Sequence, residues 1–107
     1  MATTTKRSIE LESEQIETIE LALDALMRLG MGQFDVINSL ISTGVILHKS
    51  SNEVSIATHE LNEDARDITR KLEELLGYDQ STLGIFNPKV NTHAKRAYDL
   101  KQLLKKG

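Results

Sequence analysis

Apolar residues recur at the spacing of a helix between residues 13 and 30. Two stripes are present: Ile16, Ile19, Leu23 and Leu26 form one, and Leu21, Ala25 and Leu29 form the other. Ser13 is a favourable N-cap residue, and Gly30 follows the last apolar position. We therefore predict a helix from about 14 to 29. Because its apolar surface is wide, we expect it to pack on two sides, one of them against a second subunit.

Three further helices are predicted from similar patterns. One covers 33–42, and Gly44 follows as the glycine that closes it. Another ends at Gly77 and begins near Ser55 or only after Asn62, since both residues can cap a helix. The last begins at Asn91 or Thr92 and carries apolar residues as far as Leu104.

The segments between these helices are shorter or less regular. Residues 1–6 are small and polar and are expected to be disordered, whereas 7–12 alternate polar and apolar residues like a half-buried strand. Residues 45–48 are a short strand or a buried loop, 49–52 a turn, and 78–90 a structured loop. The strand at 7–12 has few candidate partners within the chain, which favours pairing with another subunit.

The composition supports a helical fold. Aromatic residues are only 4% of the 107, so the core must come from aliphatic side chains, which suit packed helices better than a sandwich or barrel. The length fits one domain. We predict a mainly α domain over 7–107, with four to five helices and one or two short strands, that assembles as a homo-oligomer.

Charge is unevenly distributed although the net charge is only −3. All charged residues from 9 to 24 are acidic, and nearly all from 87 onward are basic. These segments are expected to pair within the fold, to pair across a dimer, or to form two solvated helix faces. The overall acidity argues against double-stranded nucleic acid as a partner.

Cysteine is absent, which excludes disulfides, thiol catalysis and thiolate metal sites. The first residues lack the apolar stretch of a secretory signal, and no run approaches the roughly 20 apolar residues of a membrane span. We therefore expect a cytoplasmic protein without membrane association. The three histidines are scattered, and no catalytic or nucleotide-binding motif occurs, so neither a metal, a cofactor nor an enzymatic activity is predicted.

The segment RLGMGQF at 28–34 is the first candidate binding site. The backbone amides of Gly32, Gln33 and Phe34 would point out of the start of the second helix, where an anion or phosphate binds readily. Arg28 would add positive charge, and Gln33 could bind a polar edge. The alternative is structural: a tight corner between two helices needs glycine, and Phe34 fills the core.

The last helix offers a second set of candidates. Arg96 could bind an anion, and Tyr98 is either a core residue or a platform on which a base stacks. Ala94 and Ala97 are small and would leave room beside Tyr98 for a partner helix or a flat ring.

Two segments together resemble small, uncharacterised proteins of tailed bacteriophages. They are RLGMGQF after LALDALM, and GIFNPKVNTHAKRAYDL at 84–100, where a G-I-[FY]-x-P turn leads into a helix with AYDL. The resemblance covers roughly 13–40 and 83–103. It implies phage origin and, with it, an anti-defence role as a sponge that sequesters a nucleotide signal in a pocket between subunits.

Two functions are therefore expected from the sequence. The first is non-catalytic capture of an anionic, nucleotide-like immune signal. Its predicted site residues are Arg28, Gly32, Gln33, Phe34, Arg96 and Tyr98. The second is a helical dimer that docks a host or phage protein through its acidic first helix or its basic carboxyl terminus.

Overall fold

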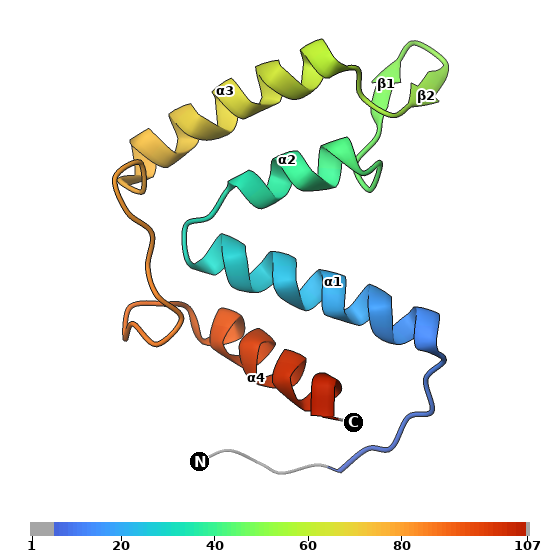
Figure 1. Ribbon diagram of the computed structural model, residues 1–107, viewed down its shortest axis with the longest axis vertical. Helices are drawn as coiled ribbons and strands as arrows, with labels where there is room; N and C mark the ends of the chain where they lie inside the picture. Colours follow the sequence, from blue (N-terminus) through green and yellow to red (C-terminus); the bar gives the residue numbers. More distant parts are fainter. Residues whose placement is uncertain (1–5, 107) are drawn as a thin grey trace.

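The computed structural model describes residues 6–106 and contains four helices and one antiparallel hairpin (Figure 1). The helices are α1 (Ser13–Gly30), α2 (Asp35–Ser42), α3 (His59–Leu76) and α4 (Thr92–Lys106), and the strands are β1 (His48–Ser50) and β2 (Glu53–Ser55). The predicted mainly helical class is confirmed. Residues 1–5, most of the segment expected to be disordered, lie outside the described residues.

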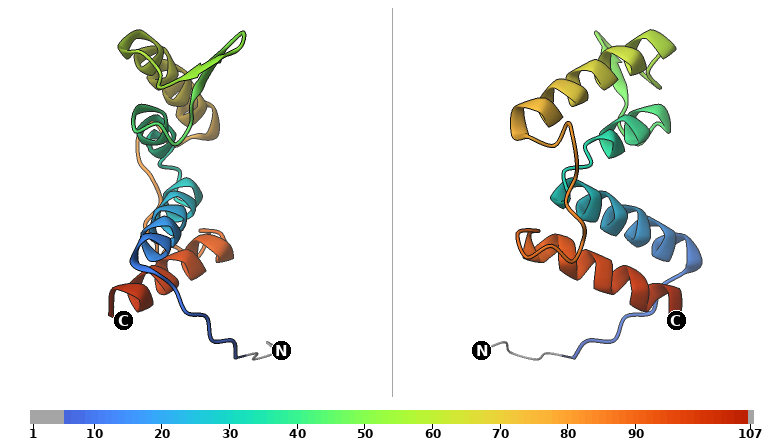
Figure 2. Two further views of the ribbon diagram at one scale, coloured as in Figure 1. Left: turned by 90° about the vertical axis from the view of Figure 1, so that its right-hand side faces the viewer. Right: turned by 60° about the vertical axis from the view of Figure 1, so that its left-hand side comes forward.

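The four helices form a single layer in the order α3, α2, α1, α4, with packing contacts between neighbours (Figures 1 and 2). The molecule measures 46 × 35 × 23 Å, and its radius of gyration is 16.7 Å. A compact chain of this length would have a radius of gyration of about 13 Å. No second layer of the described residues covers either face, so the core is thin. It comprises Met31, Val36, Val90, Ala94 and Ala97.

The closest helix packing is between α1 and α4, which run antiparallel (Figure 1). A side chain at Gly30 would overlap the Cβ of Ala94, and Ala94 is only 1% exposed. Small residues therefore let the two backbones approach each other. The space that Ala94 and Ala97 were expected to leave for a partner helix or a ring is filled by α1.

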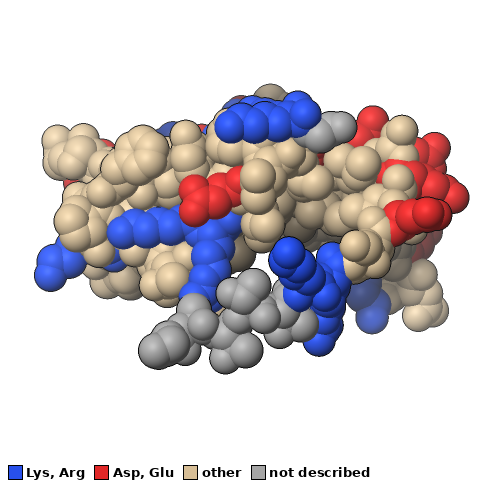
Figure 3. All heavy atoms as spheres, turned by 90° about the horizontal axis from the view of Figure 1, so that it is seen from below, with Lys and Arg blue, Asp and Glu red and all other residues tan. Residues whose placement is uncertain are grey.

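The antiparallel arrangement also places the acidic start of α1 alongside the basic end of α4. Figure 3 shows the molecule from below relative to Figure 1. Acidic side chains gather at its right end, and Lys and Arg side chains lie across the middle and at the opposite end. An ion pair between Asp24 and Lys101 joins the two helices. The predicted pairing of the charged segments within the fold is thus confirmed at this position.

Gly32 ends α1, in place of the predicted Gly30. Its φ is +86°, its amide donates to the carbonyl of Leu29 at 3.1 Å, and the amide of Gln33 donates to that of Arg28 at 2.9 Å. This is a Schellman motif, which satisfies the last carbonyls of a helix. Gly30 remains helical.

Several predicted boundaries need correction. Within the single chain the segment at 7–12 is exposed and forms no strand, since no strand edge of the described residues lies beside it. Its predicted pairing with another subunit stays a prediction. α1 is capped by the side chains of Glu12 and Gln15 and not by Ser13. The N-cap of α3 is Thr58, which satisfies the amide of Leu61, and α2 begins two residues later than expected. Of the two residues considered for the N-cap of α4, Asn91 is correct, because its side chain accepts a hydrogen bond from the amide of His93.

The hairpin is also displaced relative to the expectation. β1 begins at His48, and the turn occupies Ser51 and Asn52. Val45, Ile46 and Leu47 precede the strand and are exposed, so they form neither a strand nor a buried loop.

Candidate ligand-binding site

The corner at 28–34 is closed by the loop that follows α3. The aromatic ring of Tyr78 lies over Gly32 at a distance that leaves no room for a Cβ, and Gly32 is buried. Phe34 packs edge-on against the same ring, with 6.0 Å between centroids. The amides of Gly32 and Gln33 already donate to carbonyls of α1. The structural alternative therefore accounts for these two amides, and they are not free to bind an anion.

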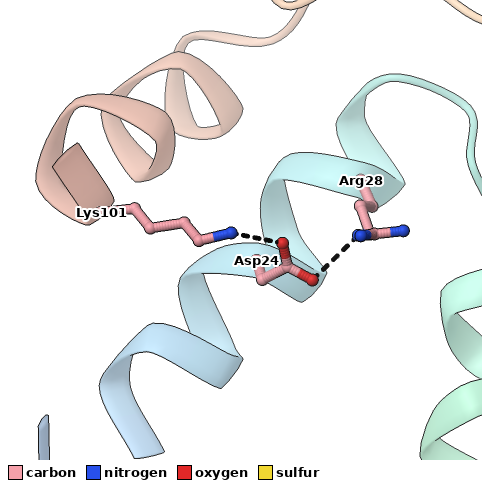
Figure 4. A network of polar contacts seen from close by, with 3 residues as sticks. All are labelled: Asp24, Arg28 and Lys101. Atoms are coloured by element: carbon pink, nitrogen blue, oxygen red, sulfur yellow. Dashed lines mark hydrogen bonds and ion pairs between the residues drawn. The ribbon is translucent and has the colours of Figure 1, made fainter. Parts of the chain in front are cut away.

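Arg28 takes part in an ion-pair network at the α1–α4 interface (Figure 4). Its Nε donates to Asp24 at 2.9 Å, and Lys101 Nζ donates to the other carboxylate oxygen at 2.7 Å. Burial raises the pKa of Asp24, but the hydrogen bond from Lys101 and the positive charge of Arg28 outweigh it. The net pKa is below the usual range of a carboxyl group. The predicted ligand-binding arginine is thus paired with a carboxylate of its own helix, and Lys101 links that carboxylate to α4.

Removing the charge of Asp24 is expected to destabilise the fold in a pH-dependent way. A carboxyl whose pKa is depressed by folding stabilises the protein above its unfolded pKa, and that stability is lost as the pH falls through the folded pKa. Asp24→Asn should lower the free energy of unfolding by about 1 kcal/mol at pH 7. Urea titrations at pH 7 and pH 3 measure the difference in the free energy of unfolding between the wild type and this variant. That gap should shrink at pH 3. Glu17→Gln, an exposed acid on α1, is the control, and a gap equal at both pH values would contradict the network.

The two predicted residues of α4 lie on different sides of that helix. Arg96 is exposed and is turned about 200° from Ala94, which faces α1. Tyr98 is half-buried and packs edge-on against Phe86, with 5.6 Å between centroids. A cavity of about 200 Å³ beside this pair is lined by Ile85, Phe86, Lys95, Tyr98 and Asp99. It includes none of the other five predicted residues.

A larger cavity, of about 300 Å³, lies between α2 and α3. All its lining side chains are polar or charged: Asp35, Asn38, Ser39, Ser42, Arg66, Thr69, Arg70 and Glu73. We call it the α2–α3 groove. α2 and α3 also meet through apolar side chains, since Ile41 lines a separate cavity with Leu61 and Ala65. The α2–α3 groove is the polar part of the contact between the two helices.

Asn38 lines the α2–α3 groove and joins α2 to α3. Its Nδ2 donates to Thr69 Oγ1 at 2.9 Å, and that hydroxyl donates to the carbonyl of Arg66 at 3.0 Å. Because the proton of Thr69 is used in this way, its oxygen can only accept from Asn38, which fixes the orientation of the amide. Asn38 Oδ1 is then buried with no hydrogen-bond partner among residues 6–106. A buried oxygen in this state costs about 1–3 kcal/mol unless a donor reaches it.

Arginine side chains supply positive charge to the same groove. Arg66 and Arg70 are one turn apart on α3 and both line it. Arg70 Nη1 also lies 3.6 Å from Asp67 Oδ1, and this exposed ion pair contributes little to stability. Asp35 and Glu73 bring acceptors to the groove. The groove therefore carries two positive and two negative side chains, and a ligand there would need an anionic group beside the arginines and N–H or O–H donors beside the carboxylates.

Sequence reasoning missed the α2–α3 groove, although a signal was present. The polar residues of α2 recur at the i, i+3, i+4, i+7 spacing of a helix face: Asp35, Asn38, Ser39 and Ser42. Such a face is normally solvated, and only the packing shows that it is turned towards α3.

The described residues place two further limits on the site. Between residues 6 and 106, no three His, Asp or Glu side chains come close enough together to hold a metal ion. No helix in the same range combines the length and apolarity needed to cross a bilayer.

No family model matches the chain, and no curated protein or solved structure is significantly similar to it.

Proposed function

We propose that this protein is a non-catalytic binding protein for a small, anionic, nucleotide-like molecule, and that the α2–α3 groove holds it. One observation carries the proposal: Asn38, whose Oδ1 has no hydrogen-bond partner among residues 6–106, lines the same groove as Arg66 and Arg70. A ligand that donates to this oxygen and carries an anion for the arginines would satisfy both features.

A nucleotide has both groups on one molecule. The exocyclic amine or ring N–H of a base can donate to Asn38, and a phosphate accepts from a guanidinium in a bidentate fashion. Asp35, Glu73 and the hydroxyls of Ser39 and Ser42 can accept from a ribose or from the base. A volume of about 300 Å³ is at the lower end for small-molecule sites, which fits one nucleotide unit.

The resemblance to phage proteins adds a biological role to this chemistry. A binding protein without catalytic groups acts by lowering the free concentration of its ligand, so a phage would use it to sequester a nucleotide signal of host defence. The expectation that the ligand lies at a subunit interface stays a prediction, since the α2–α3 groove is lined by residues of one chain. The residues that the sequence predicted for the ligand site, at 28–34 and on α4, are less suited to bind a ligand than the α2–α3 groove. Tyr78 covers Gly32, and Arg28 is paired with Asp24.

Native mass spectrometry with a panel of cyclic dinucleotides and ADP-ribose tests the proposal, followed by calorimetry on any component retained. Arg66→Gln with Arg70→Gln is expected to weaken binding at least tenfold, about 1.4 kcal/mol, because two charge-assisted hydrogen bonds are lost. Lys105→Gln with Lys106→Gln removes the same two positive charges far from the groove and should leave affinity unchanged. Circular dichroism checks that each variant stays folded.

Two outcomes would overturn the groove as the binding site. If Arg28→Gln or Tyr98→Ala removes binding while the α3 variants retain it, the ligand belongs to the corner or to the α4 cavity. If the protein stays bare with every component, small-molecule capture is wrong for this class of ligand.

A bare protein would favour the second function, docking of another protein. The outer side of α4 supports it, because Leu100 and Leu103 are exposed there close to the basic residues Lys105 and Lys106. Lys101 is not part of that docking surface, since its ammonium is engaged by Asp24.

A further inference from the structure

α3 is amphipathic, and part of its apolar side is turned away from α2 and exposed. Thr69, Arg66 and Glu73 line the groove against α2. Ile68, by contrast, is 67% exposed and Leu75 is 80% exposed. Leu61, Ala65 and Leu72 of the apolar side are half-buried within the chain, and Leu61 and Ala65 line a cavity with Ile41 of α2. An amphipathic helix normally buries its apolar side, so the exposed part of that side, at Ile68 and Leu75, lacks a partner in the single chain.

The apolar positions of α3 follow the spacing by which two helices pack. They are separated by four, three, four and three residues: Leu61, Ala65, Ile68, Leu72 and Leu75. This alternation is that of the a and d positions of a coiled coil. The flanking g positions are Asp64 and Lys71, both exposed, and neither forms an ion pair with any residue between 6 and 106.

We propose that a second copy of this chain packs on this surface, with the two α3 helices antiparallel about a twofold axis near Ile68. In that arrangement Asp64 of each copy lies across from Lys71 of the second copy, which gives two symmetric ion pairs. In a parallel pair Asp64 and Lys71 would instead face Thr69 and Leu76 and find no opposite charge. The charge pattern of α3 is thus complementary to itself in the antiparallel orientation.

The antiparallel pairing also brings an exposed leucine to an apolar pocket. Leu61 and Leu75 lie seven residues on either side of Ile68, or about 10 Å along the helix axis. Leu75 of one copy therefore lies opposite Leu61 of the second copy. Leu61 lines a cavity of about 180 Å³ with mostly apolar neighbours, including Ile46, Leu47 and Ala65. Twofold symmetry makes this contact twice, and it covers apolar side chains that the single chain leaves exposed.

The single chain exposes more surface than a compact monomer. It exposes 8543 Å², whereas a folded monomer of its mass exposes about 6,000 Å². Part of the difference belongs to the extended segment before α1, and the rest belongs to a single layer of helices with two open faces. Such a chain gains burial from a second copy, and an obligate homodimer buries roughly 1,000–2,500 Å² on each partner. This assembly is independent of any ligand and can be tested without one.

Light scattering coupled to size exclusion, and sedimentation equilibrium, measure the assembly. The wild type is expected at twice its chain mass of 12.0 kDa at low micromolar concentration. Ile68→Glu and Leu75→Glu should raise the dimer dissociation constant at least tenfold. Leu103→Glu changes a residue that is 63% exposed on α4 and should leave the dimer intact. A monomeric wild type, or a dimer broken only by Leu103→Glu, overturns the proposal.

Charge reversal tests the orientation, and it does so without placing a charge in the apolar row. Asp64→Lys and Lys71→Asp should each weaken the dimer several-fold, because each creates two like-charged contacts. The double variant should restore wild-type affinity. Within one helix these residues are seven positions apart and about 10 Å from each other, so a restoration must come from the second copy. Additive losses in the double variant would overturn the antiparallel pairing.

Discussion

Gly32→Ala is expected to lower the free energy of unfolding by about 2–4 kcal/mol. Two costs combine in this variant. Gly32 has a φ of +86°, a conformation that costs an L-residue about 1–2 kcal/mol. The new methyl group would also overlap the ring of Tyr78, which is held against Phe34. Urea denaturation followed by circular dichroism measures the loss, which is a large fraction of the stability of a small domain.

Gly77→Ala is the matched control for this variant. Gly77 has nearly the same φ, +85°, but nothing lies within 4 Å of a Cβ built there. It should therefore cost only about 1–2 kcal/mol, the conformational part alone. The difference between the two variants measures how tightly Tyr78 closes the corner. Equal losses would show that the ring moves aside easily and would reopen the corner as a place where a ligand can approach.

Gly30→Ala is expected to destabilise the packing of α1 on α4 by about 1–2 kcal/mol. The added methyl group would overlap the Cβ of Ala94, a buried atom that belongs to no flexible side chain. Helix propensity acts in the opposite direction, since Ala is about 1 kcal/mol better than Gly within a helix. The overlap should nevertheless prevail, because the two helices can separate only by opening the small core around Met31 and Val90. The same denaturation experiment measures the change.

A double variant distinguishes this explanation from a general effect on α1. Ala94→Gly removes the atom that the new methyl group meets, so Gly30→Ala with Ala94→Gly should recover stability relative to the sum of the single variants. A coupling of about 1–2 kcal/mol is expected for residues in direct contact. If Gly30→Ala instead stabilises the protein, helix propensity decides the outcome and the α1–α4 distance is not limited by these two residues.

These variants also separate the roles of the two glycines that stand two apart in RLGMGQF. Gly30 permits close packing of two helices, and Gly32 ends one of them beneath an aromatic ring. Both roles concern stability. A ligand would therefore be bound elsewhere, and the α2–α3 groove with its unpartnered Asn38 oxygen is the strongest candidate in the described part of the chain.

The sequence by itself determined the features that depend on local interactions. The stripes of apolar residues located all four helices, and capping residues such as Asn91, together with the glycines at 44 and 77, marked several of their ends. These signals are local because a helix forms its hydrogen bonds within a few residues. The mainly helical class followed from the same patterns and from the scarcity of aromatic residues.

The tertiary structure alone decided which surfaces meet. The alternation at 7–12 was typical of a strand, but a strand also needs a neighbouring edge, and none lies beside it among residues 6–106. The sequence showed which residues form the polar face of α2 and which form the apolar face of α3. It did not show how the two helices are oriented relative to each other. Packing turned polar side chains towards each other in the α2–α3 groove and left Ile68 and Leu75 outside. Periodicity assigns residues to the faces of one helix, whereas the partner of each face depends on contacts between distant segments.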